Sequence, residues 1–233
     1  MSLIDISRRV SPASAVFPGD KAFEIVQTDI GSCVVGRIAT TLHIGTHADA
    51  PNHFVRGAAG IADVDLAKYF GPVRVVERIG NGPITADDVA KWGVQRGMRY
   101  LAKTQRTIDP DVFPDEFAHL TPDAARALAA AGAELFGIDT SSVDQKDSKT
   151  LDAHKALLAG GVAILENLDL TAARPGPYEL MAFPLRIAGA DASPVRAVLR
   201  TLMWDDPAAP PLDRGVADRR RRRRLGHPVR PGA

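Results

Sequence analysis

The sequence contains almost no cysteine and no long hydrophobic run. Cys33 is the only cysteine among 233 residues, so the chain cannot form an internal disulfide, which fits a reducing compartment. No run of about 18 apolar residues is present, so no membrane-spanning helix is expected. Residues 1–7 include an acid and no long apolar segment, so no signal peptide is expected either. Together these features predict a cytoplasmic protein.

The charges nearly balance over the chain, but they are unevenly distributed. The 29 Lys and Arg residues and 28 Asp and Glu residues give a net charge of +1. Residues 208–233 carry eight Arg and two Asp, a net of +6, so residues 1–207 carry −5. A domain that binds nucleic acid is expected to have basic surface within its fold, so the acidic body argues against nucleic acid as a partner.

The C-terminal segment differs in composition from the rest of the chain. Residues 205–211 are rich in Pro, residues 219–224 are six consecutive Arg, and no apolar periodicity continues past Trp204. We therefore predict one domain over residues 1–204 and a disordered tail over residues 205–233. A basic arm that binds nucleic acid or an acidic surface is the functional alternative, but a tail without a specific role is favoured.

Strand signals outnumber helix signals, and the two alternate in the second half of the chain. Helices are expected from Thr85 to Gly93, from Thr121 to Gly132 and over residues 154–158, because capping residues and glycines bound these segments. The expected strands cover residues 3–6, 23–30, 34–42, 73–79, 100–103, 135–138, 162–165, 180–187 and 195–200. This order predicts an α/β domain with a mixed sheet.

Histidine is also scarce, and three of the six histidines lie in one short segment. His43, His47 and His53 occupy odd positions together with Asp49, so an extended chain would place all four on one face. In a flat strand, His43 and His47 would lie roughly 13 Å apart, too far to share one ion. The backbone must therefore bend, and Gly45 is the residue that allows a bend.

This density of potential ligands indicates a metal site. Imidazole together with carboxylate suits Zn or Mn, and no thiolate is available here. The alternative is a set of unrelated polar residues where a strand meets a loop. For a single histidine that alternative would be favoured, but three histidines and an acid in a histidine-poor chain favour a metal.

A second pair of candidate ligands lies further along the chain. His154 is near the start of a short predicted helix, and Glu166 ends the next predicted strand. The helix and the Gly-Gly turn after it can return the chain so that both side chains point into one cleft. They would then allow a second metal, with Asp49 and Glu166 bridging the two ions. Taken alone, His154 could be a capping histidine and Glu166 a solvated acid.

The segment His43-x-Gly45-Thr46-His47-x-Asp49-x-Pro51-x-His53-Phe54 resembles the signature of the cyclase-like metal hydrolases. That family includes bacterial kynurenine formamidase (arylformamidase), isatin hydrolase and polyketide-cyclase relatives. Further stretches are similar to the formamidases, namely residues 5–7, 10–12, 17–20, 137–144, 148–154, 164–168 and 191–199. The resemblance runs from about residue 3 to residue 202 and leaves out the Arg-rich tail.

The resemblance implies a three-layer β/β/α fold that forms homodimers. It implies that His43, His47 and Asp49 hold one metal. It also implies that His154 holds a second metal and that Asp49 and Glu166 bridge both. Two Zn²⁺ ions per chain are therefore expected, with Mn²⁺ as the other candidate.

The implied activity is hydrolysis of N-formyl-L-kynurenine to L-kynurenine and formate in tryptophan breakdown. A bound metal would activate water at neutral pH and stabilise the developing oxyanion. By the resemblance, His53 is the proton donor or acceptor that serves the leaving arylamine. Phe17 stands where formamidases usually carry a Trp that lines the substrate pocket, and it keeps an aromatic face but has no indole N–H.

Two other functions remain open from the sequence. A related metal hydrolase that opens a cyclic amide such as isatin would keep every metal ligand and differ in the aromatic pocket around Phe17. A non-catalytic protein with a basic arm and a structural metal is the alternative from another class, and its metal would be closed by four protein ligands. Its binding to nucleic acid would depend on salt and on residues 219–224.

Truncation after Trp204 tests the prediction for the tail. The Pro-rich exit and the Arg run have no core-forming pattern, so the shortened protein is expected to fold and to turn over substrate like the full chain. Thermal unfolding and a rate assay measure both properties. Loss of the thermal transition, or of most of the rate, would show that the tail belongs to the domain.

Overall fold

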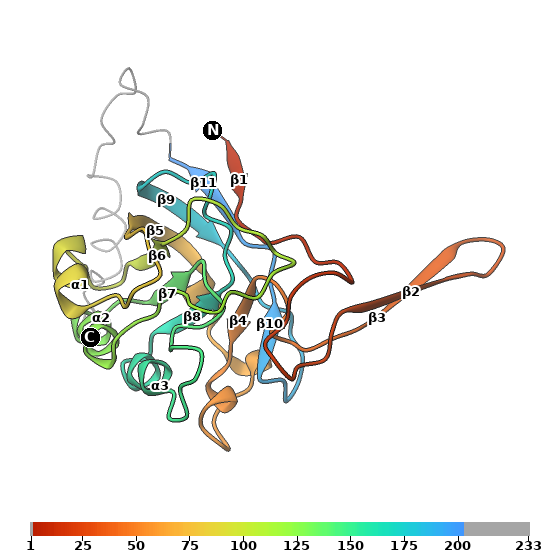
Figure 1. The fold of residues 1–233 in the computed structure, drawn as a ribbon, viewed down its shortest axis with the longest axis horizontal. Coiled ribbons are helices and arrows are strands. Elements are labelled where there is room, and N and C mark those ends of the chain that lie inside the picture. The colour runs from red at the N-terminus through yellow and green to blue at the C-terminus, as the bar shows by residue number, and fades with distance from the viewer. Residues whose placement is uncertain (1, 203–233) are drawn as a thin grey trace, which may run out of the picture. The chain divides into compact units, whose positions relative to one another are not determined.

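The computed structural model describes residues 2–202 (Figure 1). The predicted tail, residues 205–233, lies outside the described residues. Among residues 2–202, no helix is long and apolar enough to cross a membrane.

One mixed sheet organises the described part of the chain. Within residues 2–202 it has nine strands in the order β1-β11-β9-β5-β6-β7-β8-β4-β10. The pairs β5–β6, β6–β7 and β7–β8 are parallel, and the other neighbours are antiparallel. The strands are β1 (Leu3–Asp5), β4 (His47–Asp49), β5 (Phe70–Glu77), β6 (Arg99–Lys103), β7 (Leu135–Ile138), β8 (Ala163–Glu166), β9 (Gly176–Met181), β10 (Ala192–Pro194) and β11 (Val198–Thr201). The predicted α/β fold with a mixed sheet is confirmed.

Each parallel pair is connected through a helix, as parallel strands require a long crossover. The helices are α1 (Ala86–Trp92), α2 (Pro122–Ala131) and α3 (Asp152–Ala159), and they lie together beside β6, β7 and β8 (Figure 1). Thr85 caps α1 in a reciprocal pair with Asp88, and Thr121 caps α2. Gly93 and Gly132 end these helices with positive φ angles of 62° and 79°. The predicted boundaries of α1 and α2 are therefore confirmed, whereas α3 (Asp152–Ala159) extends beyond the predicted residues 154–158 at both ends.

Side chains alternate between two hydrophobic cores on the two faces of the central strands. Leu101, Leu135 and Leu165 point to one core, which is also built from strands at both ends of the sheet. Tyr100 and Phe136 point to the other core, which the helices cover. The sheet therefore curls over one of its own faces while helices cover the other, which produces β/β/α layering.

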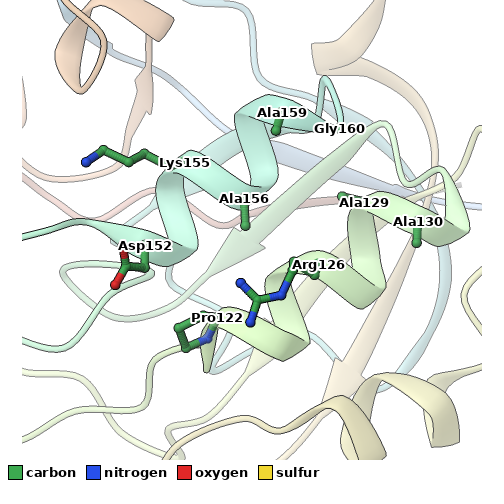
Figure 2. A pocket seen from close by; sticks show the side chains of 9 residues that line it. All are labelled: Pro122, Arg126, Ala129, Ala130, Asp152, Lys155, Ala156, Ala159 and Gly160. Carbon is green, nitrogen blue, oxygen red and sulfur yellow. The ribbon is translucent and has the colours of Figure 1, made fainter.

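Helices α2 and α3 pack closely because small residues line their contact. A Cβ added at Gly160 would lie 2.3 Å from the Cβ of Ala129, so no larger residue fits there without a shift. Figure 2 shows the shallow groove that remains between the helices, where Arg126 and Lys155 are the long charged side chains. None of the candidate metal ligands lines this groove.

One predicted strand is wrong in its position. The strand expected over residues 180–187 is β9, Gly176–Met181, and the chain leaves the sheet directly after it. Pro184 has no N–H to donate to a ladder, and Phe183 and Leu185 are exposed. The strand expected over residues 195–200 begins later, at Val198, and the short strand β10 precedes it.

A separate hairpin extends away from the sheet (Figure 1). Its strands are β2 (Glu24–Asp29) and β3 (Val34–Ala39), which pair with each other and with no other strand of residues 2–202. All of its strand residues are exposed, although many of them are apolar. The larger apolar side chains on this hairpin are Ile25, Val26, Ile30, Val34, Val35 and Ile38.

Candidate metal centre

Strand β4 brings the candidate ligands together through its two neighbours. It pairs with β8 so that His47 lies opposite Glu166, and with β10 so that Asp49 lies opposite Ala192. Residues directly opposite each other in an antiparallel pair have their side chains on the same face. His47 and Asp49 are two positions apart in the strand and share that face with Glu166.

A bend at Gly45 brings His43 to the same place. Gly45 has a φ of +56°, and a Cβ there would lie 2.6 Å from Val10 Cγ2, so the position requires glycine. The ring centroids of His43 and His47 are 4.9 Å apart. The predicted bend is confirmed, and a short 3₁₀ turn over Pro51–His53 then returns His53 toward the same rings.

Asp49 lies at the centre of two groups of potential ligands. Its Oδ1 is 3.2 Å from His43 Nδ1 and 3.4 Å from His47 Nε2. Its Oδ2 is 3.3 Å from His154 Nε2. The carboxylate of Glu166 lies 3.4 Å from His47 Nε2 and 3.3 Å from His154 Nε2. The structure thus brings together all five residues that the sequence singled out as ligands, in two overlapping groups that could each hold a metal ion.

The buried atoms in this cluster fit a cation. His47 Nε2 and both carboxylate oxygens of Asp49 are buried and have no hydrogen-bond partner within residues 2–202. Buried polar atoms are normally paired, because leaving them unpaired costs free energy. A divalent ion between these atoms would satisfy all three, so the residues present suit a metal.

Neighbouring groups hold the candidate ligands in orientation. Asp144 accepts a 2.6 Å hydrogen bond from His154 Nδ1, which turns His154 Nε2 toward Asp49 and Glu166. The carboxylate of Asp144 also accepts from two backbone N–H groups at the start of α3. His47 Nδ1 lies 2.9 Å from the carbonyl oxygen of Gly45. Such partners set the tautomer of a ligating histidine, and the sequence analysis missed Asp144.

The electrostatics of the cluster favour positive charge. Burial lowers the pKa of His47, but the close carboxylates of Asp49 and Glu166 more than offset it and raise the pKa to about 10. Burial has the opposite effect on a carboxylate and raises the pKa of Asp49, but the surrounding imidazoles hold this pKa well below its ordinary value. The carboxylates therefore remain ionised, and a metal would bind by displacing imidazole protons.

His53 lies beside this cluster at its more open side. Its ring centroid is 4.1 Å from that of His43, and its Nδ1 is 3.4 Å from Asp191 Oδ2. Burial lowers the pKa of His53, and Asp49 only partly offsets this, so the ring is neutral near neutral pH. Asp191 also lies 3.3 Å from His43 Nε2. The sequence analysis gave Asp191 no role, because its contact with a histidine 148 residues away is created only by the fold.

A cavity of about 490 Å³ opens onto these residues. His43, His47, His53, His154 and Glu166 line it together with Asp191 and Asn167. Phe17 also lines it, as the sequence predicted for a pocket residue, and packs edge-to-face on Phe113 with 5.4 Å between ring centroids. The cavity therefore combines polar groups at the cluster with an aromatic wall.

The cavity also carries a partly buried positive charge. Arg8 donates from Nη2 to the backbone oxygen of Asp139, while its buried Nε has no partner within residues 2–202. Burial lowers the pKa of Arg8 to about 10, so the guanidinium stays charged at neutral pH. Lys146 and Lys149 line the same cavity. An anionic group on a bound molecule would be stabilised on this side.

The sequence of this chain is similar to those of known proteins. The sequence profile described as Putative cyclase matches residues 4–145. The kynurenine formamidase of Salinibacter ruber is 44% identical over 207 residues, which are 86% of this chain and 98% of that protein. That of Delftia acidovorans is 43% identical over 205 residues, with the same coverage of both chains.

Several solved structures have a fold similar to that of this chain. One is described as a potential metal-dependent hydrolase with cyclase activity, and it superposes with a TM-score of 0.77 at 32% identity, over 85% of this chain and 96% of the other. Isatin hydrolase A from Labrenzia aggregata shares the fold, with a TM-score of 0.75 at 20% identity over 85% and 93% of the two chains. The profile covers more than half of this sequence and the curated relatives align over nearly their whole length, and the chain therefore belongs to the Putative cyclase family.

Proposed function

We propose that this protein is a metal-dependent amide hydrolase that converts N-formyl-L-kynurenine to L-kynurenine and formate. The observation that carries the proposal is the cluster of five converging ligands with unpaired buried atoms, placed on a cavity beside a neutral histidine. The kynurenine formamidases at 43–44% identity support the choice of substrate.

The residues divide into two overlapping metal sites in this proposal. His43, His47 and Asp49 would hold one ion, and His154 would hold the other, with Asp49 and Glu166 shared by both. The donor set of imidazoles and carboxylates suits Zn²⁺ or Mn²⁺. When bound, such ions supply Lewis acidity, which activates water at neutral pH and polarises the formyl carbonyl.

His53 would carry the proton in the reaction. Amide hydrolysis forms a bond between the water oxygen and the formyl carbon and breaks the bond from that carbon to nitrogen. The arylamine leaves readily only if its nitrogen receives a proton. A neutral imidazole can take the proton from water and then give it to the nitrogen. His53 lies on the cavity and is neutral near neutral pH, as this role requires.

The cavity walls suit both ends of the substrate. Phe17 and Phe113 offer aromatic faces for the aryl ring. Arg8 lines the cavity and offers a positively charged partner for the α-carboxylate of an amino-acid substrate. A cyclic amide such as isatin has no such carboxylate, so the Arg8 guanidinium favours the linear substrate over this alternative.

Parallel assays of the two substrates test the function. We expect hydrolysis of N-formyl-L-kynurenine with a kcat/KM at least about tenfold above that for isatin, because isatin leaves Arg8 without an anionic partner. Chelation of metal should abolish the activity, and added Zn²⁺ or Mn²⁺ should restore it. Faster turnover of isatin would favour the cyclic-amide alternative, and metal-independent activity would contradict the proposed chemistry.

Replacing His53 separates proton transfer from metal binding. His53→Ala should keep two ions per chain and lower kcat by about 10² to 10⁴, the range for losing a general acid or base. His47→Ala should lose metal and activity together, because His47 Nε2 faces both Asp49 and Glu166. Elemental analysis and steady-state rates measure the two properties.

His119→Ala is the matched control, since His119 Nδ1 contacts only the backbone oxygen of Phe117 in the described structure. It should leave both metal and rate unchanged. A metal-depleted His53→Ala protein would make His53 a ligand instead. A single tight ion in fully loaded wild-type protein, with Glu166→Ala still metallated and active, would contradict the binuclear site.

We also propose that the protein is a homodimer in which the β2–β3 hairpin contacts a second copy. The hairpin exposes apolar side chains that no other part of residues 2–202 covers, and Ile25 pairs with Ile38 on one of its faces. Exposed apolar surface of this kind marks an interaction site. A second copy of the chain would bury it.

Sedimentation of Ile38→Lys tests this interface. The charge should be costly at a buried apolar contact, so the variant should sediment as a monomer at concentrations where the wild type is a dimer. Leu66→Lys is the matched control, because Leu66 is also exposed but lies outside the hairpin. An unchanged dimer in Ile38→Lys, or a monomeric wild type, would contradict the proposal.

A further inference from the structure

We infer that Asp191 is a positioning residue that holds the rings of His43 and His53 together and directs the Nε2 atom of His53 toward the leaving nitrogen of the substrate. The inference rests on the proposed function and concerns the same site. Asp191 is not among the residues that the sequence indicated as ligands or as the proton carrier.

A single oxygen of Asp191 contacts both rings. Oδ2 lies 3.3 Å from His43 Nε2 and 3.4 Å from His53 Nδ1. His43 presents its other nitrogen, Nδ1, to Asp49 at 3.2 Å. One nitrogen of each imidazole thus faces Asp191. The second nitrogen of His43 faces the ligand cluster, and the second nitrogen of His53 remains available for substrate.

The backbone around Asp191 is fixed to the strand that carries Asp49. The backbone oxygen of Asp191 accepts a 2.9 Å hydrogen bond from the Ala50 N–H. The next residue, Ala192, begins β10 and lies opposite Asp49 in the β4–β10 pair. A side chain held by a strand pair keeps its orientation better than one on a free loop.

His53 depends on this carboxylate more than His43 does. Among residues 2–202, Asp191 is the one carboxylate within 4.0 Å of a His53 ring nitrogen. His43 has Asp49 as a second partner. Loss of Asp191 should therefore release the His53 ring first, while His43 stays tied to the cluster.

The contact with Asp191 can set the tautomer of His53 and stabilise its charged form during the reaction. A neutral imidazole has one N–H, and a carboxylate beside Nδ1 keeps the hydrogen on that atom. The lone pair then sits on Nε2, which can accept a proton from water. Once the ring is positively charged, Asp191 stabilises it, and Nε2–H donates to the amide nitrogen as the carbon–nitrogen bond breaks. The proton that leaves water ends on the amine, so no other reactant is required.

A comparison of amide and ester substrates tests the role. Formanilide needs a proton on its leaving nitrogen, whereas phenyl formate releases phenoxide without one. Asp191→Asn should lower kcat for formanilide by about 10- to 100-fold and kcat for phenyl formate by a clearly smaller factor, because the ester loses only the help with the proton of water. KM and the metal content should stay near wild type, and Asp191→Glu should restore part of the loss. In a protein that already carries His53→Ala, adding Asp191→Asn should lower kcat for formanilide little further, because the two residues act as one unit.

Asp144→Asn is the matched control. Asp144 faces His154 Nδ1, the same ring atom that on His53 faces Asp191, but His154 Nε2 faces the two central carboxylates. This variant should lower metal affinity and reduce turnover of both substrates equally. Thermal unfolding of each variant, loaded with metal, shows whether it is folded.

Several outcomes would overturn the inference. Equal losses on amide and ester with metal depletion would make Asp191 a support for the metal cluster only. Full additivity with His53→Ala would show that the two residues act separately. A third ion per chain that disappears in Asp191→Asn would make His43, His53 and Asp191 a metal site, since their ligand atoms lie close enough to hold one. If the wild type hydrolyses neither substrate, the proposed hydrolase function itself fails.

Discussion

The burial of Asp49 and Glu166 side by side is the constraint on which the rest of the site depends. Each carboxylate is almost inaccessible to solvent, and each raises the pKa of nearby imidazoles. An uncompensated pair of buried negative charges would cost several kcal/mol, so the site is stable only with positive charge between the carboxylates. Protonated imidazoles can supply that charge, and a divalent cation can supply it with better geometry. A metal bound between these carboxylates would therefore also stabilise the fold.

The curled sheet is what makes this arrangement rigid. Strand β4 has only three residues, but it is paired on both sides, with β8 and with β10. Glu166 is the last residue of a strand whose other neighbour, β7, belongs to the parallel, helix-covered half of the sheet. The antiparallel end of the sheet thus supplies Asp49 and His47, and the parallel half supplies Glu166. The candidate metal ligands lie where the two halves meet.

The sequence predicted the local features well, and the long-range ones less so. Thr85, Thr121, Gly93 and Gly132 act through neighbours within a turn of helix, so their signals are readable in the sequence. The histidine-rich segment was readable because its ligands are close together in the chain. Asp144 and Asp191 were not, because their importance comes from contacts that only the fold creates. The misplaced strand over residues 180–187 has a similar origin: its apolar residues fit a strand, but Pro184 and the end of the β9 pairing take the chain out of the sheet.

Burial separates the groups that hold charge from the groups that we propose to move protons. Asp49, His47, His154 and Glu166 are buried and tightly held, which suits ligands whose geometry must not change during turnover. His53 and Asp191 have side chains 30% and 46% exposed, on the cavity side of the same cluster. A proton carrier needs contact with substrate and a pKa near the working pH, and full burial among carboxylates would deny it both, as the pKa of about 10 for His47 shows. The short spacing between Asp49 and His53, with a turn at Pro51–His53, is therefore the feature that lets one segment provide both a buried candidate ligand and an accessible candidate base.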